Sequence, residues 1–365
     1  MTKSLLQLDF LELTQFKNYP SQAFEFKERI VGFCGPNGAG KTNLLDAVYY
    51  LCLTKSYFGK SDAGNIQFGK QGFRIEGRFT RQDQPFTAIC ILRETGKKEI
   101  QLNQETYTRF SQHIGKFPVV VVAPDDVSIV AGGSEERRKL LDTIISQIDP
   151  EYLQQLIQYT RILQQRNSLL KQFSEAGRID PALLSVLDQQ LIKPGQFIFE
   201  QRKRFLDGYL PEVISGYGMI AGVEEGLNLQ YQSQLLSSSF EALLERNREK
   251  DMYSQRTQGG VHRDELDIRL GEQPLRQVAS QGQRKSLLFA LKLAEFNVLR
   301  RHKGFEPILL LDDVFEKLDE HRMHNLLNWA CVENKGQVFL TDTHCNRLTI
   351  ALEKLNTGFQ IEALR

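Results

Sequence analysis

Residues 35–42 read Gly35-Pro36-Asn37-Gly38-Ala39-Gly40-Lys41-Thr42. This stretch matches the pattern G-x-x-x-x-G-K-[ST]. It lies between an apolar run over 30–34, which predicts a strand, and apolar residues at helical spacing over 44–51. The glycines let the backbone curl so that its N–H groups point at phosphate oxygens, and the N-terminus of the following helix favours the anion. We therefore expect these eight residues and Asn43 to bind a nucleotide, with Lys41 at its β- and γ-phosphates and Thr42 at a Mg²⁺ ion.

A second stretch supplies the carboxylates that such a loop requires. Four apolar residues over 308–311 predict a buried strand, and Asp312 and Asp313 follow it directly. Open α/β sheets bind ligands at the carboxyl ends of their strands, so we expect both side chains near the loop. Asp312 is predicted to bind Mg²⁺, directly or through water, and Asp313 to orient or deprotonate the attacking water. Lys41 and Asp313 are thus the candidate catalytic residues.

A third stretch opens a long helical pattern. It reads Ser280-Gln281-Gly282-Gln283. Ser280 is a good N-cap, and Gln283, three residues later, completes a capping box. Gly282 permits close approach of the backbone, so this helix N-terminus suits a second phosphate contact. Taken alone, the stretch would favour the alternative of a well-capped surface helix.

Because the acidic strand follows it, this stretch resembles the signature motif of ABC-type ATPases. The resemblance implies that residues 280–283 of one subunit cover the γ-phosphate bound by the phosphate loop of a second subunit. It also implies a dimer-contacting D-loop at Asp319 and a switch residue at one of Asp342, Thr343 and His344. ATP would then be an interfacial ligand that favours a homodimer, and hydrolysis of ATP would let the dimer dissociate.

The order of patterns along the chain is strands, helices, strands. Strand patterns occupy most of the first 120 residues, helical spacing dominates from about 134 to 250, and strands return from about 257, followed by a long helix. The helical segments are predicted to be antiparallel and too short and irregular for a long coiled coil. We expect an α/β fold: a P-loop ABC-type ATPase head built from residues 1–123 and 251–365, with an inserted helical arm over 124–250.

Composition bounds the class of protein. The chain has 365 residues, 41% hydrophobic and 25% charged, as expected for a soluble globular protein of two or three domains. Lys and Arg number 46 against 45 Asp and Glu, so the balance neither implies nor excludes a nucleic-acid partner. Five scattered cysteines without C-x-x-C spacing favour a reducing compartment. Since no secretion signal is visible and no apolar run approaches the about 20 residues of a membrane span, we expect a soluble cytoplasmic protein.

Several local motifs in combination resemble the RecF family of bacterial recombination mediators. They read Phe16-Lys17-Asn18-Tyr19, GPNGAGKTNLLDAVYYL over 35–51, Pro124-Asp125-Asp126 with Arg137-Arg138, YTRILQQRNSLL over 159–170, Gly260-Val261-His262-Arg263-Asp264, SQGQRKSLLFALKLAE over 280–295 and LLLDDVFEKLDEHR over 309–322. One departure is Val261, which stands where the motif G-P-H-R-D has proline. The signature follows the phosphate loop later than in transporter ATPase subunits and sooner than in SMC-type proteins with long coiled coils, which agrees with this family.

The resemblance implies an ATP-dependent protein that binds single-stranded or gapped DNA. By the same resemblance it dimerises on ATP, hydrolyses it weakly and, with RecO- and RecR-like partners, promotes the loading of RecA in recombination, replication and the response to DNA damage, including SOS. No DNA-contact residue is assigned, because a solvated helix face explains each basic candidate as well. The candidates are Arg137, Arg138, Lys139, Arg161, Arg166, Arg202, Lys203 and Arg204. His262 and Arg263 are expected to be structural or interfacial, and Lys17 either to approach the nucleotide or to be solvated.

Three other functions stay open on the sequence. A transporter ATPase subunit is disfavoured by the late signature, and copurification with a membrane protein would support it. A small-molecule kinase is disfavoured by the signature itself, and transfer of the γ-phosphate to a metabolite would support it. Another repair ATPase of the SMC superfamily is harder to exclude, and absence of binding to a RecR-like partner would favour it.

Overall fold

A computed structural model describes residues 6–176, 180–222, 224–313 and 320–364. The chain folds as two compact units. The head unit comprises Met1–Asp126 and Lys292–Arg365, and the arm unit comprises Val127–Leu291. The arm unit thus extends beyond residue 250, the limit expected for the arm, and includes the strands and the signature stretch that the sequence analysis placed in the head.

A parallel sheet of five strands forms one layer of the head unit. The strands are β3 (Ile30–Cys34), β8 (Val119–Val122), β12 (Ile308–Leu311), β13 (Val338–Asp342) and β14 (Gln360–Ala363). Their order is β14-β3-β13-β12-β8, and every neighbouring pair is parallel. β3, β8, β12 and β13 are buried along their whole length, as the continuous apolar runs predict for a parallel sheet covered on both faces. The order brings the ends of β3 and β12 to either side of β13.

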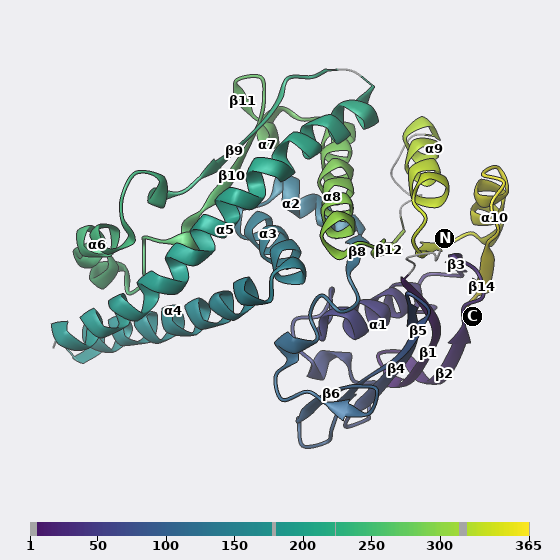
Figure 1. Cartoon of the computed structure of the whole chain (residues 1–365), viewed down its shortest axis with the longest axis horizontal. Helices are drawn as coiled ribbons and strands as arrows, with labels where there is room; N and C mark the ends of the chain where they lie inside the picture. The colour runs from purple at the N-terminus through teal and green to yellow at the C-terminus, as the bar shows by residue number, and fades with distance from the viewer. Residues whose placement is uncertain (1–5, 177–179, 223, 314–319, 365) are drawn as a thin grey trace. The chain divides into compact units, whose positions relative to one another are not determined.

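An antiparallel sheet of six strands, in the order β2-β1-β4-β5-β6-β7, forms a second layer of the head unit. The strands are β1 (Leu6–Phe16), β2 (Tyr19–Glu25), β4 (Phe73–Arg81), β5 (Gln84–Leu92), β6 (Lys98–Leu102) and β7 (Glu105–Thr106). Helix α1 (Lys41–Leu53) contacts strands of both sheets and is buried on nearly all sides, so it lies in the core between them (Figure 1). Two further helices of this unit are α9 (Glu320–Asn328), continued by a π-helical turn Trp329–Glu333, and α10 (Cys345–Glu353). The expected α/β class is confirmed.

The arm unit contains mostly helices and one small antiparallel sheet. The helices are α2 (Val127–Ala131), α3 (Ser134–Ile148), α4 (Pro150–Ala176), α5 (Pro181–Ala221), α6 (Phe240–Ser254), α7 (Leu275–Val278) and the first part of α8 (Gln281–Lys303), which ends in the head unit. The strands are β9 (Leu227–Gln232), β10 (Glu265–Leu270) and β11 (Gln273–Pro274), in the order β11-β10-β9. Strands therefore return at residue 227, earlier than expected. α4 and α5 run side by side (Figure 1), and α5 continues through Pro194 and Pro211.

Buried arginines hold the arm unit together. Arg166 is fully buried and donates to Asp188 at 2.6 Å and to Asp251 at 2.7 Å. Arg202, also buried, donates to Asp142 at 2.8 Å and to Asp264 at 2.9 Å. These two residues are neither DNA contacts nor part of a solvated helix face, contrary to both explanations considered for them. The sequence spacing could not reveal that these arginines are buried in ion pairs, because their acidic partners lie on segments distant in the sequence.

Arg137 is a third basic candidate that the structure buries. It forms a two-pronged ion pair with Glu265, at 2.7 and 2.9 Å. Arg138 is half-buried and donates to the Asp264 carbonyl at 2.6 Å. Lys139, Arg161, Lys203 and Arg204 are exposed and stay candidates.

The structure pairs two cysteines that the spacing left unpaired. Cys34 and Cys345 form a disulfide although 311 residues separate them. Cys52, Cys90 and Cys331 are free and buried. Across the described residues, no helix combines the length and the apolar character that a membrane span demands.

Candidate functional site

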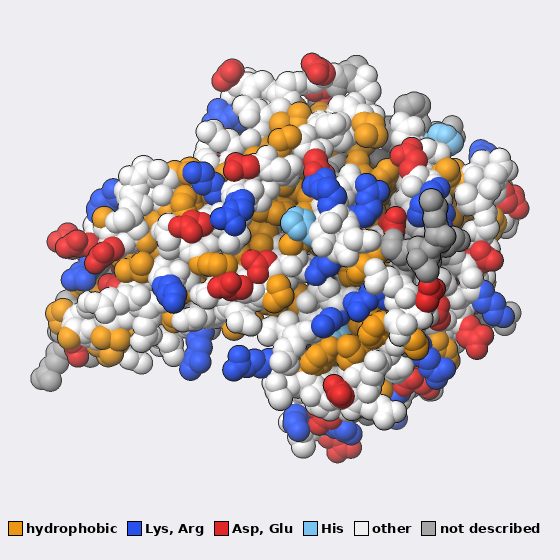
Figure 2. All heavy atoms as spheres, viewed as in Figure 1, with side chains coloured by type: hydrophobic (Ala, Val, Ile, Leu, Met, Phe, Trp, Pro, Cys, Tyr) orange, Lys and Arg blue, Asp and Glu red, His pale blue; other side chains and the backbone are white. Residues whose placement is uncertain are grey.

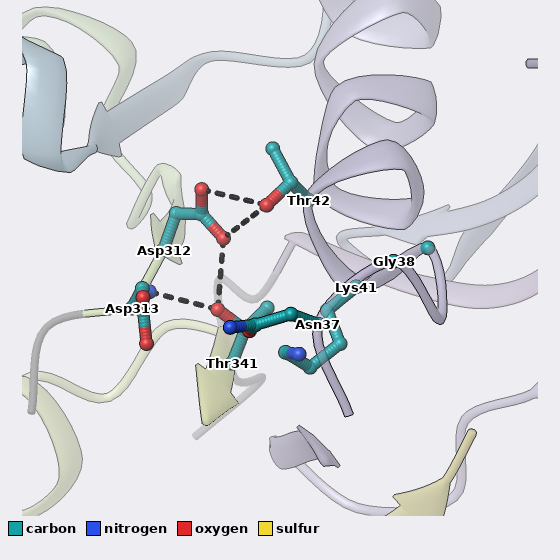
Figure 3. Close-up of a pocket in the computed structure, with 8 residues that line it drawn as sticks. Asn37, Gly38, Lys41, Thr42, Asp312, Asp313 and Thr341 are labelled. Carbon is teal, nitrogen blue, oxygen red and sulfur yellow. Dashed lines mark hydrogen bonds between the residues drawn. The ribbon is translucent and has the colours of Figure 1, made fainter. Parts of the chain in front are cut away.

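The phosphate loop and the acidic strand meet at the carboxyl edge of the parallel sheet (Figure 3). The Thr42 hydroxyl, at the start of α1, donates to the two carboxylate oxygens of Asp312 at 3.1 and 3.0 Å. Asp312 follows β12 directly and is buried, with 4% of its surface exposed. The two candidate Mg²⁺ ligands, 270 residues apart in sequence, therefore lie together as the two motifs predict.

Thr341 is a site residue that the sequence analysis missed. It is buried near the end of β13, between the other two strands. Its hydroxyl donates to Asp312 at 2.8 Å and accepts a hydrogen bond from the Asp313 backbone N–H at 2.8 Å. Asp313 has a left-handed backbone with φ of 46°, which Asp tolerates better than most residues. One hydroxyl group thus positions both consecutive acidic residues.

The side chains around this point line a small pocket with a volume of about 110 Å³. It is lined by Asn37, Gly38, Gly40, Lys41, Thr42, Asp312, Asp313 and Thr341. Lys41 is buried, and its ammonium group donates to the carbonyls of Gly35 at 2.7 Å and Pro36 at 3.0 Å. A volume of this size holds only a few water-sized groups, which suits the phosphate end of a nucleotide and not its base.

The donor set at Asp312 fits Mg²⁺. Burial raises the pKa of Asp312, and the hydrogen bonds from Thr341 and Thr42 and the charge of Lys41 oppose that rise. A buried carboxylate beside a hydroxyl group offers the hard oxygen ligands that Mg²⁺ prefers. The ion would also offset the burial of the negative charge.

The β1–β2 turn supports the phosphate loop from its other side. The Tyr19 hydroxyl donates to the Gly40 carbonyl at 3.1 Å, and the Asn18 amide donates to the Ala39 carbonyl at 3.3 Å. Gly40 has φ of 100°, and a Cβ atom there would lie 2.5 Å from the Asn18 side chain. The backbone conformation therefore favours glycine at residue 40, and a side chain there would also displace the Asn18 amide from the loop. The Asn43 amide donates to Asn18 at 2.8 Å, and Asn43 is not among the pocket-lining residues.

Lys17 of the same turn takes neither of the roles considered for it. Its ammonium group pairs with Asp46, a buried residue of α1, and is mostly buried itself. Asp46 also accepts hydrogen bonds from the Ser56 hydroxyl at 2.6 Å and the Tyr57 N–H at 2.7 Å. Lys17 therefore anchors the turn to the helix that follows the phosphate loop.

The signature stretch forms the predicted capping box in the arm unit. The Ser280 N–H donates to the Gln283 side chain at 2.8 Å, and the Gln283 N–H donates to the Ser280 hydroxyl at 3.2 Å. Gln281 and Gly282 begin α8 between these two residues. Arg284, in the next position, donates to the Arg276 carbonyl at 3.0 Å. The helix N-terminus therefore has an ordered cap of the kind that presents backbone N–H groups.

The remaining predicted site residues fall into two groups. Asp319, the predicted D-loop residue, lies outside the described residues. Among the three candidates for the switch, Asp342 is fully buried and pairs with Arg347 at 2.5 and 2.8 Å, and Thr343 is half-buried. His344 is exposed and forms the N-cap residue of α10. Of the three, only His344 presents an exposed side chain.

His262 and Arg263 make contacts inside the arm unit. Tyr159 donates its hydroxyl hydrogen to Nδ1 of His262 at 2.7 Å, and Nε2 of His262 donates to the Thr257 carbonyl at 2.9 Å. Burial lowers the pKa of His262 to about 4, so the ring is neutral near pH 7. Arg263 donates to the Thr257 carbonyl and to Gln258. Of the structural and interfacial roles expected for both residues, these contacts favour the structural role.

Comparison with known proteins identifies the family. Residues 7–362 match the family described as the RecF/RecN/SMC N-terminal domain. The chain is 39% identical to the DNA replication and repair protein RecF of Flavobacterium johnsoniae, over 98% of this chain and 99% of the relative. It is 38% identical to the RecF of Bacteroides thetaiotaomicron, over 96% of this chain and 95% of the relative.

Solved structures agree with these relatives. A structure described as the recombination mediator protein RecF-ATPrS in the RecFOR pathway is similar with a TM-score of 0.86 and 28% identity, over 94% of each chain. An Smc head domain from Pyrococcus furiosus, at 17% identity and a TM-score of 0.52, shares the fold only. The match over nearly the whole length, at this identity and with the phosphate loop and acidic strand in place, shows that the chain belongs to the RecF family.

Proposed function

We propose that this chain is an ATP-dependent DNA-binding protein of recombinational repair and replication maintenance. The observation that carries the proposal is the contact of Thr42 with Asp312 beside the Lys41 loop, in a chain whose relatives are named DNA replication and repair protein RecF. Solved relatives described as RecF-ATP and RecF-ATPrS support ATP as the nucleotide.

We propose that the residues of the pocket hydrolyse ATP, and by the family resemblance we expect this hydrolysis to be weak. The loop N–H groups and α1 bind the phosphates, and Lys41 exchanges its two carbonyl partners for the β- and γ-phosphates. Thr42 and Asp312 would hold Mg²⁺, which would neutralise charge on the transferred phosphoryl group. Asp313, held by Thr341, orients the attacking water. Hydrolysis here serves to reset a conformational switch.

ATP favours a homodimer in this proposal. The capped N-terminus at Ser280–Gln283 of a second copy contacts the γ-phosphate held by the first copy's loop. A ligand that binds the dimer and not the separate monomers shifts the equilibrium by mass action. Loss of the γ-phosphate on hydrolysis removes that contact, so the dimer dissociates into monomers.

DNA binding has a local electrostatic basis in the head unit. Lys and Arg are interspersed with Asp and Glu over the face shown in Figure 2, and the whole chain has 46 Lys and Arg against 45 Asp and Glu, so the proposed binding depends on local groups of cations. Arg81, Lys116 and Lys303 form such a group, which we call the basic cluster. Burial lowers the pKa of Lys303, and repulsion by Lys116 and Arg81 lowers it further. No ion pair joins the three to a carboxylate among the described residues, so a phosphate backbone is a fitting counter-ion.

The partners follow from the family. The solved relatives are described as part of the RecFOR pathway, and we propose RecO- and RecR-like proteins as partners of this chain in loading RecA onto single-stranded or gapped DNA in the cytoplasm.

Sedimentation with and without Mg-ATP, in the presence of a short gapped duplex, tests the proposal. Wild type is expected to form ATP-dependent dimers that bind the duplex. Lys41→Met and Ser280→Arg are each expected to stay monomeric, and Ser237→Arg, at an exposed serine of the same unit, is expected to dimerise like wild type. A wild-type protein that stays monomeric with ATP and ignores the duplex would overturn the proposal.

A further inference from the structure

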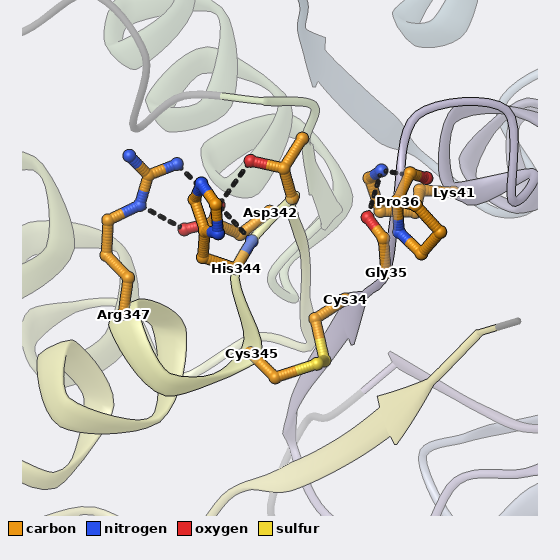
Figure 4. The surroundings of a disulfide bond; sticks show 9 residues. Cys34, Gly35, Pro36, Lys41, Asp342, His344, Cys345 and Arg347 are labelled. Carbon is orange, nitrogen blue, oxygen red and sulfur yellow. Dashed lines mark hydrogen bonds and ion pairs between the residues drawn. A yellow bond between two sulfur atoms is a disulfide. The ribbon is translucent and has the colours of Figure 1, made fainter.

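The disulfide lies at the base of the candidate site (Figure 4). Cys34 is the last residue of β3 and directly precedes Gly35 of the phosphate loop. Cys345 is the first residue of α10 and directly follows His344, the exposed switch candidate. The two Cα atoms are 5.0 Å apart. The bond therefore joins the base of the phosphate loop to the segment that carries the switch candidate.

The two cysteines differ in a way that suits stepwise oxidation. Cys345 is half-buried and lies in the first turn of a nine-residue helix, where the helix dipole favours the thiolate form. Cys34 is fully buried, so a reagent from solvent reaches Cys345 first. The three other cysteines are buried, and burial raises the pKa of Cys90 and Cys331 to about 12 and the pKa of Cys52 well above its usual range. Those three thiols are therefore protonated and unreactive by comparison.

The bond constrains the segment that carries the switch candidate. Apart from the disulfide, two backbone contacts hold this segment to the loop. The Gly35 N–H donates a hydrogen bond to the Asp342 carbonyl at 3.3 Å, and Asp342 of β13 pairs with Cys34 of β3. On the loop side, the Leu364 N–H donates to the Cys34 carbonyl at 2.7 Å, and a Cβ atom on Gly35 would lie 2.4 Å from the Leu364 carbonyl oxygen, so the backbone at the base of the loop is closely packed. With the bond formed, His344 is tied covalently to the rigid base of the loop. Movement of His344 relative to a bound γ-phosphate is then restricted.

We propose that Cys34 and Cys345 form a reversible redox site whose oxidation slows ATP hydrolysis, an inference that rests on the proposed function. The Cys345 thiolate attacks a low-molecular-weight disulfide RSSR, forming a Cys345–SR bond and releasing RS⁻, which takes up a proton. The Cys34 thiol loses its proton and attacks the Cys345 sulfur, releasing the second RS⁻. The sum is RSSR plus two protein thiols giving two RSH and the Cys34–Cys345 disulfide, and excess RSH reverses it.

The chemistry is tested on the full chain with oxidised and reduced glutathione, followed by alkylation and mass spectrometry. Oxidised wild type is expected to lose alkylation at Cys34 and Cys345 only. Cys34→Ala is expected to stop at a glutathione adduct on Cys345, whereas Cys345→Ser is expected to gain no adduct on Cys34. Wild type without the intramolecular bond, or an adduct spread over all five cysteines, would overturn the redox site.

The consequence is tested by ATP hydrolysis and by the binding of a fluorescent ATP analogue. Oxidation is expected to lower the hydrolysis rate at least about fivefold, the lower end of a typical coupling between two sites, with restoration by dithiothreitol and with nucleotide affinity retained. Cys345→Ser is expected to be insensitive to the oxidant, and Asn346→Ser, at the same exposed helix end, to respond like wild type. Equal rates in the two redox states of wild type would overturn the regulation. If neither state hydrolyses ATP, the proposed function fails and this regulation with it, while the alkylation pattern still decides the redox site.

Discussion

Thr341 is a positioning residue whose single hydroxyl group holds both acidic residues of the candidate site. Thr341→Val removes a hydrogen bond to the buried Asp312 carboxylate and leaves the Asp313 N–H without its acceptor. A hydrogen bond to a charged group contributes about 1.5–3 kcal/mol, so we expect ATP hydrolysis to fall by roughly ten- to a hundredfold. The loss should appear in kcat, with the affinity for Mg-free ATP retained, because the loop and Lys41 are untouched.

Thr341→Ser is the matched control for that change. It keeps the hydroxyl group and removes only a methyl group, so most of the activity should return. Steady-state kinetics of the two variants separate positioning from packing: a serine variant as slow as the valine variant would contradict the role assigned to the hydroxyl.

His113 makes the stability of the head unit depend on pH. It is fully buried, its Nε2 lies 2.6 Å from the Leu51 carbonyl, and burial lowers its pKa from 6.5 to about 4. Below pH 6.5 the unfolded chain binds a proton at this residue that the folded chain does not, so stability is lost as the pH falls from 6.5 to 4. At pH 5 the loss from this residue is about 2 kcal/mol, at about 1.4 kcal/mol for each unit of pKa difference.

His113→Gln isolates that contribution, because glutamine retains an N–H donor for Leu51 and does not titrate. Urea unfolding at pH 7 and pH 5 should show a smaller pH-dependent loss in the variant than in wild type. The same loss in both proteins would mean that His113 is not the titrating group.

At the scale of elements, α3, α4 and α5 are joined to the 261–264 segment by Arg202. Its guanidinium group contacts Asp142 and Asp264, the Tyr152 hydroxyl at 3.1 Å and the Val261 carbonyl at 2.7 Å. Arg202→Met leaves two carboxylates without their counter-charge, one of them buried, which typically costs about 3–5 kcal/mol. Urea unfolding should therefore show a clear loss of stability in the arm unit.

Arg204→Met, on an exposed part of the same helix, is the matched control and should change the free energy of unfolding by less than about 0.5 kcal/mol. Equal effects of the two variants would contradict the ion-pair network.

Elements differ in how far the sequence predicts them, and the reason is the range of the interactions that form them. β3 and β12 match the apolar runs over 30–34 and 308–311, because strands buried on both faces need only a continuous apolar run. α5 continues past Pro194, although proline inside a helix removes a hydrogen bond and favours an end there. Packing decides the outcome: a Cβ atom on the neighbouring Gly195 would lie 2.0 Å from the Phe240 ring, so this turn of α5 is pressed against another element.

At the scale of the whole molecule, the candidate site is predictable where its residues are contiguous. The phosphate loop and the Asp312–Asp313 pair each carry their own pattern and their own flanking elements. Thr341 and the Cys34–Cys345 pair carry none. Strand pairing between distant parts of the chain places β13 beside β3 and β12, and Cys345 follows β13 at the start of α10. The same limit explains the arginines of the arm, whose ion pairs join segments that local spacing cannot relate.

The basic cluster of Arg81, Lys116 and Lys303 gives the proposed DNA binding a measurable salt dependence. Each phosphate contact releases counter-ions, so log K falls with log salt by about 0.7–0.9 for each cation that contacts the backbone. Lys116→Gln and Lys303→Gln should each weaken binding to a gapped duplex and make that slope shallower by about 1, independently of the DNA sequence.

Arg81 is left in place because its guanidinium group packs over the Phe86 ring at 4.6 Å, so its removal would also disturb packing. Lys97→Gln is the control, since Lys97 already pairs with Glu99 at 3.3 Å and should leave the slope unchanged. A fluorescence-anisotropy titration at several salt concentrations measures the slopes of wild type and the three variants. Variants of the cluster that keep the wild-type slope would place the DNA elsewhere on the molecule.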